Sequence, residues 1–392
     1  MTFTAARRLE LPRPDGTLES FAPGEPAPFE PPARPLRSRV FFAAAHVVCD
    51  PLAPGDPAGP ARLDWDATLA YRRHLWSWGL GVAEAMDTAQ RGMGLDWAAA
   101  RELIRRSISE ARASGGEIAC GAGTDQLPAD RPASLDAIRE AYLEQLGFIE
   151  GEGGRGGMMA SRALAVAARS ADDYRSIYDA VLAEARRPVI LHWLGEQFDP
   201  SLRGYWGARD LDEASATVLE LIADNAERID GIKTSLLDAE RERALRRALP
   251  ANVRPYTGDD LNYPDLIRGD GEAASDALLG VFDAIAPAAS AALQALDAGD
   301  AAGFDERLAP TLPLARRLFE PPTPGYKTGI AFLAYLGGHQ RHFRMVGGLE
   351  SARSILHLSE VFRLADRAGL LRDPDLAAER MRRLLALAGV GE

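Results

Sequence analysis

The sequence predicts an α/β protein built on a (β/α)8 TIM barrel, in which eight parallel strands alternate with helices around a closed core. Three observations lead to this prediction. Short apolar runs alternate with longer segments of helical periodicity between residues 38 and 283. Apolar strands separated by helices pair in parallel, because each crossover must return the chain to the same end of the sheet. No Gly-x-Gly-x-x-Gly turn follows the first apolar run, as a dinucleotide-binding open sheet would require.

The first half of the barrel is expected from four apolar runs and the helices that follow them. The strands are predicted at 40–48 (VFFAAAHVV), 81–86 (GVAEAM), 117–121 (EIACG) and 157–161 (GMMAS). The helices are predicted at 67–78, 97–113, 134–146 and 172–185. Ser134 is a predicted N-cap, because its hydroxyl can accept a hydrogen bond from the first turn of the helix.

The second half repeats the same pattern. Its strands are predicted at 188–193 (PVILHW), 230–235 (DGIKTS), 253–257 (VRPYT) and 277–281 (ALLGV). Its helices are predicted at 211–225 and 240–249. A barrel of eight such units takes roughly 250 residues, so a chain of 392 residues has extensions on both sides.

The two extensions differ in composition. Residues 1–37 are rich in proline, glycine and charge, which predicts an irregular N-terminal arm before the barrel at 38–283. Residues 284–392 show only helical periodicity and are predicted to form an α-helical extension. The apolar faces of these helices must be buried against the barrel or at a subunit interface, so we expect a homo-oligomer.

Composition restricts the partners. A formal net charge of −12 repels nucleic acid and anionic membranes, so neither is an expected partner. The expected partner is a small-molecule substrate. Two cysteines cannot form a disulfide framework and fit a reducing compartment. The first residues lack the apolar stretch of a signal peptide, which predicts a cytoplasmic protein.

Barrels of this kind carry their active sites at the carboxyl ends of the strands. Lys233 is the most informative residue there, because an ammonium inside an apolar strand is costly to bury. Burial lowers the pKa of an amine, and the neutral amine is a nucleophile toward a carbonyl. The residues alone leave a second interpretation open, in which Lys233 reaches the barrel rim or forms an ion pair with Asp259 or Asp87.

Two segments carry a resemblance to a known family. IDGIKTSLLD (229–238) and VRPYTGDD (253–260) resemble the sixth and seventh strands of the dihydrodipicolinate synthase/N-acetylneuraminate lyase family. More narrowly, the chain resembles an uncharacterised bacterial branch described only as dihydrodipicolinate-synthase-like. The resemblance covers most of 38–300. It implies a Schiff-base lysine at Lys233, and a substrate-site turn that contains Gly258 and Asp259.

The departures from this family concern the other site residues. His192 stands where the family has a tyrosine, and it can serve as a general acid/base or as a core histidine hydrogen-bonded to a neighbouring strand. The family's Gly-Thr-Thr-Gly-Glu loop is replaced by residues 87–91, in which Thr88 keeps one hydroxyl. Arg91 is a candidate partner for a substrate carboxylate, with an ion pair to Asp96 as the alternative. The family's arginine after strand five is missing.

These observations predict a class I lyase or aldolase that acts on a 2-oxo acid or a sugar-derived carbonyl. Lys233 forms the imine, His192 moves protons, and Thr88 with Arg91 orients the carboxylate. Asp87 or Asp259 binds the acceptor or tunes the lysine. Trp193 and Gly258 complete the predicted substrate site. No cofactor is expected, because the imine itself serves as the electron sink.

Two other interpretations remain open from the sequence. A metal-dependent aldolase or isomerase on the same barrel would hold a divalent metal ion through strand-end ligands. The candidate ligands are His46, Glu84, Asp87, His192 and Asp259. Alternatively, the chain is a non-catalytic barrel that binds a ligand.

Overall fold

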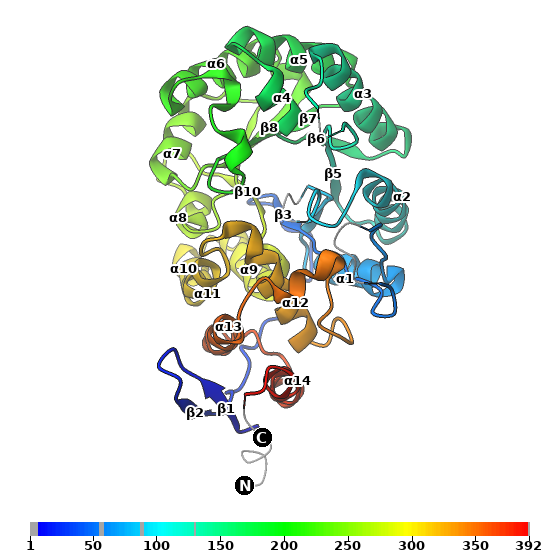
Figure 1. The fold of residues 1–392 in the computed structure, drawn as a ribbon. Coiled ribbons are helices and arrows are strands. Elements are labelled where there is room, and N and C mark those ends of the chain that lie inside the picture. The colour runs from blue at the N-terminus through cyan, green and yellow to red at the C-terminus, as the bar shows by residue number, and fades with distance from the viewer. Residues whose placement is uncertain (1–6, 55–58, 87–89, 129–130, 391–392) are drawn as a thin grey trace. The chain divides into compact units, whose positions relative to one another are not determined.

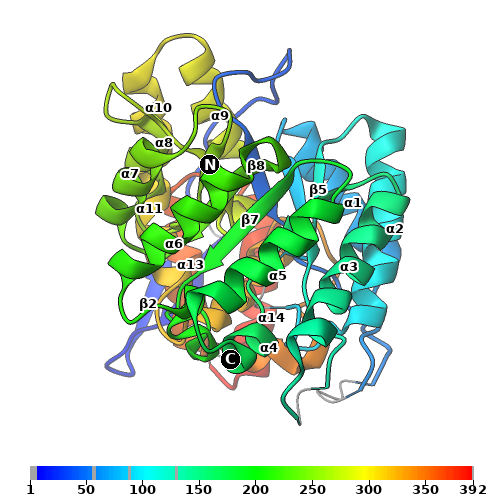
Figure 2. The same cartoon turned by 90° about the horizontal axis from the view of Figure 1, so that it is seen from above.

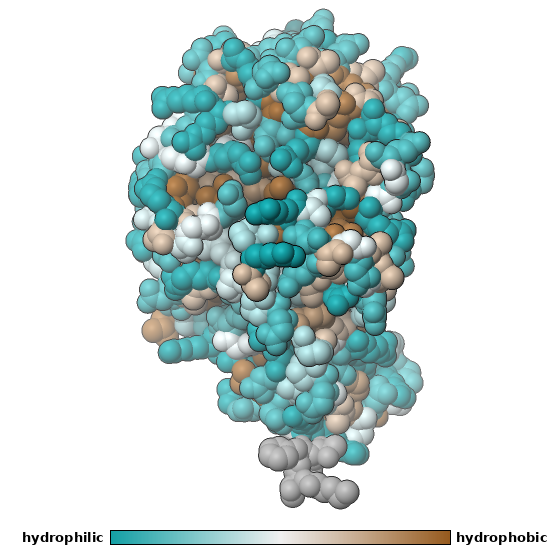
Figure 3. Space-filling view, turned by 180° about the vertical axis from the view of Figure 1, so that it is seen from behind, coloured by the Kyte–Doolittle hydropathy of each residue, from teal (hydrophilic) through white to brown (hydrophobic). Residues whose placement is uncertain are grey.

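The structure, a computed structural model, describes residues 7–54, 59–86, 90–128 and 131–390 (Figure 1). The chain divides into two compact units. We call Arg39–Ala45 with Leu80–Gly280 the barrel unit, and Met1–Ser38, His46–Gly79 and Val281–Glu392 the helical unit. The face drawn in Figure 3 is mostly hydrophilic, with hydrophobic side chains in small separate patches.

The barrel unit contains a closed ring of eight parallel strands in the order β10-β3-β4-β5-β6-β7-β8-β9, which confirms the predicted (β/α)8 fold. The strands are β3 (Phe41–Ala44), β4 (Gly81–Glu84), β5 (Ile118–Ala122), β6 (Arg155–Met158), β7 (Val189–Leu194), β8 (Ile229–Ser235), β9 (Arg254–Thr257) and β10 (Asp276–Leu279). Each strand overlaps one expected apolar run, although β6 shares only residues 157 and 158 with the run expected at 157–161. The first is shorter than expected, since β3 ends at Ala44 rather than at residue 48.

Helices cover the outside of this ring (Figures 1 and 2). They are α2 (Trp97–Ser114), α3 (Leu135–Gly151), α4 (Arg162–Ala167), α5 (Ala171–Glu184), α6 (Leu211–Asp224), α7 (Ala239–Ala248) and α8 (Tyr263–Arg268). Ser134 caps α3 as predicted, because its hydroxyl accepts a hydrogen bond from the backbone N–H of Ala137 at 3.2 Å.

Side chains of alternate residues fill the inside of the barrel. The buried cluster there consists of Phe42, Ala44, Ala83, Met86, Ala119, Ile190, Tyr256 and Leu278. Because successive side chains of a strand point to opposite faces, this cluster identifies the inward-facing residues of β3, β4, β5, β7, β9 and β10. At the amino-terminal end of β8, Asp230 accepts a hydrogen bond from Tyr256 Oη at 2.7 Å and pairs with Arg155 at 3.3 Å.

The helical unit is built on α1 (Trp65–Ser77), α9 (Phe282–Asp297), α10 (Ala301–Leu308), α11 (Leu312–Leu318), α12 (Tyr326–Leu336), α13 (Ile355–Arg367) and α14 (Pro374–Leu387). The helical pattern expected from residue 284 is therefore present. Among the described residues, no helix combines the length and the apolar character that a bilayer crossing requires.

The N-terminal arm is more regular than we expected. It contains an antiparallel hairpin of β1 (Leu9–Pro12) and β2 (Leu18–Phe21). The turn is closed by Asp15, which accepts hydrogen bonds from the Thr17 backbone and hydroxyl, and by Gly16 at φ 84°. Leu9 and Leu11 are buried and stabilise the hairpin together with the turn. The overall composition of the arm does not indicate these local features.

Candidate active site

Lys233 and His192 both point into the barrel. They are direct partners in the register of β8 and β7. Ile190, two residues before His192, belongs to the inner cluster, so His192 and its register partner Lys233 face the same interior, nearer the carboxyl ends of the strands. The structure therefore decides the direction of the lysine, which the sequence left open.

The Lys233 amine is enclosed without a close counter-charge. Its side chain is 8% exposed, and within the described part of the chain it forms no hydrogen bond or ion pair. Burial lowers the pKa of Lys233 to about 8, while the negative charge of Asp260 acts in the opposite direction. A substantial fraction of the amine is consequently neutral, and nucleophilic, just above neutral pH.

The carboxylate that acts on Lys233 is Asp260 rather than either expected residue. Asp259 is occupied by the turn after β9: its carboxylate accepts hydrogen bonds from the backbone N–H groups of Leu261 and Asn262 at 2.9 and 3.1 Å. A third hydrogen bond comes from the Asn262 side chain at 2.8 Å. Asp87, the other expected residue, lies outside the described residues, as does Thr88.

Gly258 makes room for the lysine. A Cβ atom at this position would lie 2.9 Å from Lys233 Cε, 2.1 Å from Ser235 Oγ and 2.8 Å from the carbonyl oxygen of Thr234. The Gly258 N–H also donates to that carbonyl at 2.8 Å, so the turn after β9 is held directly against β8. Glycine is needed here for close approach rather than for an unusual backbone conformation.

His192 is 1% exposed, and only one of its two ring nitrogens has a hydrogen-bond partner. Its Nε2 lies 3.2 Å from Ser235 Oγ, whereas its buried Nδ1 has no hydrogen-bond partner. Burial, reinforced by the positive charge of Lys233, moves the pKa of His192 well below its ordinary value, so the ring is neutral at physiological pH. A core histidine would also bond to a neighbouring strand, and the unpaired Nδ1 is the feature in which His192 departs from a fully satisfied core histidine.

Trp193 faces the opposite side of β7 from His192. Its ring packs edge-on against Trp206, with the centroids 6.4 Å apart. This follows from the alternation of side chains along a strand, because an inward His192 requires its neighbour to face the outer helices. Trp193 therefore does not stand beside His192 inside the barrel, where we had expected it to wall the substrate site.

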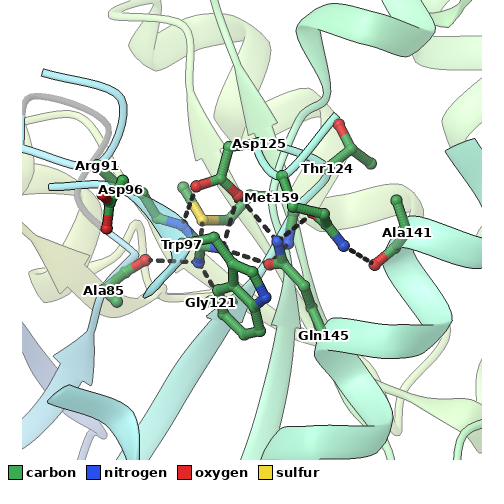
Figure 4. Close-up of polar contacts among 12 residues, drawn as sticks. Ala85, Arg91, Asp96, Trp97, Gly121, Thr124, Asp125, Ala141, Gln145 and Met159 are labelled. Carbon is green, nitrogen blue, oxygen red and sulfur yellow. Dashed lines mark hydrogen bonds and ion pairs between the residues drawn. The ribbon is translucent and has the colours of Figure 1, made fainter. Parts of the chain in front are cut away.

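Arg91 is held by the protein itself (Figure 4). Its guanidinium makes a two-pronged contact with Asp125 at 3.0 and 2.8 Å and a further hydrogen bond to Gln145 Oε1. The remaining N–H groups reach the carbonyl oxygens of Ala85 and Gly121, at 3.2 and 2.5 Å. These contacts join the ends of β4 and β5 to α3, so they act as a clamp between strand ends.

This clamp changes the expected role of Arg91. Asp96 is not its partner, because Asp96 caps α2 by accepting a hydrogen bond from the Ala99 N–H at 2.8 Å. Burial alone would raise the pKa of Asp125, but the guanidinium of Arg91 outweighs it and the pKa is lowered. With its fork occupied by Asp125, the arginine has no free edge for a two-pronged contact with a substrate carboxylate.

The described members of the possible metal set are not brought together. His46 lies in the helical unit, where its Nδ1 pairs with Asp283 at 3.0 Å. Glu84 follows the inward Ala83 and so faces away from the barrel interior. Asp259 caps its own turn, and Asp87 lies outside the described residues. In the described ranges, no group of three or more His, Cys, Asp or Glu side chains is arranged to hold a metal ion.

The sequence of residues 9–390 matches the family described as "Protein of unknown function (DUF993)". No functionally curated protein matches the chain. Solved structures match its fold at low sequence identity. Dihydrodipicolinate synthase from Aquifex aeolicus superposes with a TM-score of 0.64 at 12% identity, covering 85% of this chain and 98% of that one.

Two further structures are similar. The 4-hydroxy-tetrahydrodipicolinate synthase of Methylacidiphilum fumariolicum SolV gives a TM-score of 0.65 at 16% identity, covering 88% of this chain and 99% of that one. YagE, a prophage protein of the dihydrodipicolinic acid synthase family from E. coli K12, was solved in complex with pyruvate. It gives a TM-score of 0.61 at 14% identity, covering 90% of this chain and 99% of that one. The predicted likeness of fold to this family is thereby confirmed, while the narrower branch stays a prediction.

We predict that Gly258→Ala lowers the free energy of unfolding by about 1–3 kcal/mol, because the added methyl group overpacks β8. Gly147→Ala is the matched control. Gly147 is exposed on α3, and no neighbouring atom lies within 4 Å of the place that a Cβ would take, so its replacement should be neutral or stabilising by up to about 1 kcal/mol. Urea denaturation of both variants measures the difference, and equal stability would contradict the proposed crowding at Gly258.

We also predict that Arg91→Met destabilises the protein by about 3 kcal/mol, because it leaves the carboxylate of Asp125 and the strand-end carbonyls without their donor. In the Arg91→Met variant, the further change Asp125→Asn should lower the free energy of unfolding by less than Asp125→Asn does alone, since the two residues are coupled. Arg106→Met removes an exposed contact to Glu102 and should cost less than about 1 kcal/mol. If Arg91→Met is as mild as this control, then Arg91 is not a structural clamp.

Proposed function

Because the chain belongs to the DUF993 family, whose description names no activity, we propose from the site itself that it is a class I lyase or aldolase. In this proposal Lys233 forms a Schiff base with a 2-oxo acid or a related carbonyl compound. The observation that carries the proposal is the inward-facing Lys233 on β8, whose burial lowers its pKa to about 8 beside a neutral His192.

The reaction begins when the neutral amine attacks the carbonyl carbon, which forms a C–N bond while the carbonyl electron pair moves to oxygen. Loss of the resulting hydroxyl group as water leaves an iminium ion. The iminium then accepts the electron pair of the adjacent breaking bond, so an enamine forms and the other fragment leaves. Protonation of the enamine and hydrolysis of the C–N bond return the free lysine.

His192 supplies the proton transfers in this scheme. When its Nε2–H donates to Ser235 Oγ, Nδ1 carries a free lone pair inside the barrel. That nitrogen can take a proton from the nitrogen of the carbinolamine or from the substrate and deliver it to the carbinolamine hydroxyl, which then leaves as water, because its low pKa disfavours a lasting imidazolium. Ser235 acts as a positioning residue, since it lies two residues beyond Lys233 and fixes the ring from the same face of β8.

Support for a 2-oxo acid comes from outside the chain. YagE, which shares the fold, was solved in complex with pyruvate. Asp260 offers further support within the site, because its negative charge raises the pKa of Lys233 and would likewise stabilise the positive charge of an iminium.

The direct test is reductive trapping. We expect cyanoborohydride with a suitable 2-oxo acid to add a substrate-sized mass to the peptide that contains Lys233, as read by intact-mass and peptide mass spectrometry. Lys233→Ala should fold normally and give no adduct, whereas Lys327→Ala, at a buried lysine of the helical unit, should still be trapped if it folds. No adduct with any carbonyl compound, together with stoichiometric metal in the purified protein, would replace the imine mechanism by the metal-dependent one.

The pH dependence gives a separate prediction. The rate of trapping should rise with pH through an apparent pKa of about 8, because only the neutral amine attacks. His192 should add no inflection between pH 6 and 9, since its pKa lies well below its ordinary value. Asp260→Asn should shift the inflection to lower pH, because the carboxylate that raises the pKa of Lys233 is gone. An unchanged inflection in this variant would exclude Asp260 as the charge that tunes the lysine.

A further inference from the structure

We infer that the substrate of Lys233 carries an apolar chain or ring that ends in an anionic group, and that this part binds in a cavity beside the reacting centre. The inference rests on the proposed function and names its substrate class. The cavity has a volume of about 570 Å³ and lies in the barrel unit at the carboxyl ends of β5, β6 and β7.

The cavity is far larger than a three-carbon acid requires. Its volume lies within the range of pockets that enclose complete cofactors or drug-sized ligands, about 300–1,000 Å³. Pyruvate alone would leave most of this volume filled with water. A substrate with a substantial non-reacting part accounts for the volume, and its binding energy would help to position the carbonyl group.

Lys233 and His192 do not line the cavity, but the cavity lies near them along β7. Leu194 lines it and is the register partner of Ser235, two residues beyond the pair of His192 and Lys233. A strand rises about 3.3 Å per residue, so the cavity begins about 7 Å along β7 from the reacting pair. This distance corresponds to only a few bonds of an extended chain.

The walls favour an apolar occupant. Carbon-rich side chains supply much of the lining, namely Leu127, Pro128, Ala163, Val166, Leu194 and Leu202. Val166 is 65% exposed, so an apolar occupant of the cavity would cover it. Thr124 and Ser161 also line the cavity, but their hydroxyl groups already bond to each other at 2.6 Å. A hydroxyl-rich sugar would find few unpaired partners on these walls.

Among the described residues of the lining, the charges leave one arginine without an acidic partner. Three arginines and two aspartates contribute to it. Asp125 pairs with Arg91 at 2.8 Å, and Asp199 pairs with Arg162 at 2.5 Å. Within the described ranges, Arg131 forms no hydrogen bond or ion pair, and its side chain is exposed on the segment after β5. A carboxylate or similar anion at the far end of the substrate would give this guanidinium a partner.

The test compares 2-oxo acids by the concentration that gives half-maximal cyanoborohydride adduct on Lys233. The series is pyruvate, 2-oxohexanoate, 2-oxoadipate and a polyhydroxylated 2-oxo acid of the same chain length. We expect 2-oxohexanoate to need at least about tenfold less than pyruvate, which corresponds to about 1.4 kcal/mol. The added carboxylate of 2-oxoadipate should improve trapping further, and the hydroxylated acid should show no advantage over pyruvate.

Variants locate the effect in the cavity. Ala163→Phe fills the cavity from α4 and should bring the ratio between pyruvate and 2-oxohexanoate close to one. Ala165→Phe on the same helix, at a residue outside the lining, should leave the ratio unchanged. Arg131→Gln should remove the extra advantage of 2-oxoadipate, while Arg169→Gln, an exposed arginine outside the cavity, should not.

The outcomes separate the two proposals. Equal half-maximal concentrations for pyruvate and the longer acids, or a preference that Ala163→Phe leaves intact, would overturn the substrate class while the imine mechanism stands. A preference for the hydroxylated acid would overturn it as well. No adduct with any of the acids would overturn the proposed function and, with it, the inference drawn from it.

Discussion

The arrangement of this site depends on the removal of one amine from water. A closed ring of eight strands leaves no space for bulk solvent between its walls, so Lys233 loses most of the hydration that stabilises an ammonium. Asp260 compensates only in part, because the pKa of the lysine is still lowered to about 8. Every other feature of the centre can be understood as making this enclosure possible or as using the neutral amine that it creates.

The enclosure demands close approach and rigid strand ends. Gly258 permits the first, since any side chain there would occupy the positions of Lys233 Cε and Ser235 Oγ. The clamp around Arg91 provides the second, because one guanidinium ties the ends of β4 and β5 to Asp125 and to Gln145 of α3. An arginine committed in this way stabilises the barrel mouth, but it is no longer available to a ligand.

The sequence predicts the strands well because each strand is a local apolar run, and local runs need no knowledge of the rest of the fold. It also places Lys233 next to His192, since both stand at corresponding positions of neighbouring parallel strands. It fails for Arg91, whose partner Asp125 lies on another loop and could not be chosen from spacing. The position of Trp193 was within reach of the sequence: if His192 faces inward, the next residue of the strand must face outward.

A neutral histidine at position 192 leaves the charge of the centre to Lys233 and Asp260. His192 is neutral near physiological pH, whereas only a minority of Lys233 is, and Asp260 is the charge that raises the pKa of the lysine. In the proposed mechanism, conversion of the neutral amine into an iminium adds a positive charge beside His192, which would lower the pKa of the ring still further. The histidine therefore suits brief transfers of a proton rather than its storage. In the proposed mechanism a 2-oxo acid brings its own carboxylate, and because Arg91 is occupied by Asp125, the positive charge of the iminium would help to balance that group.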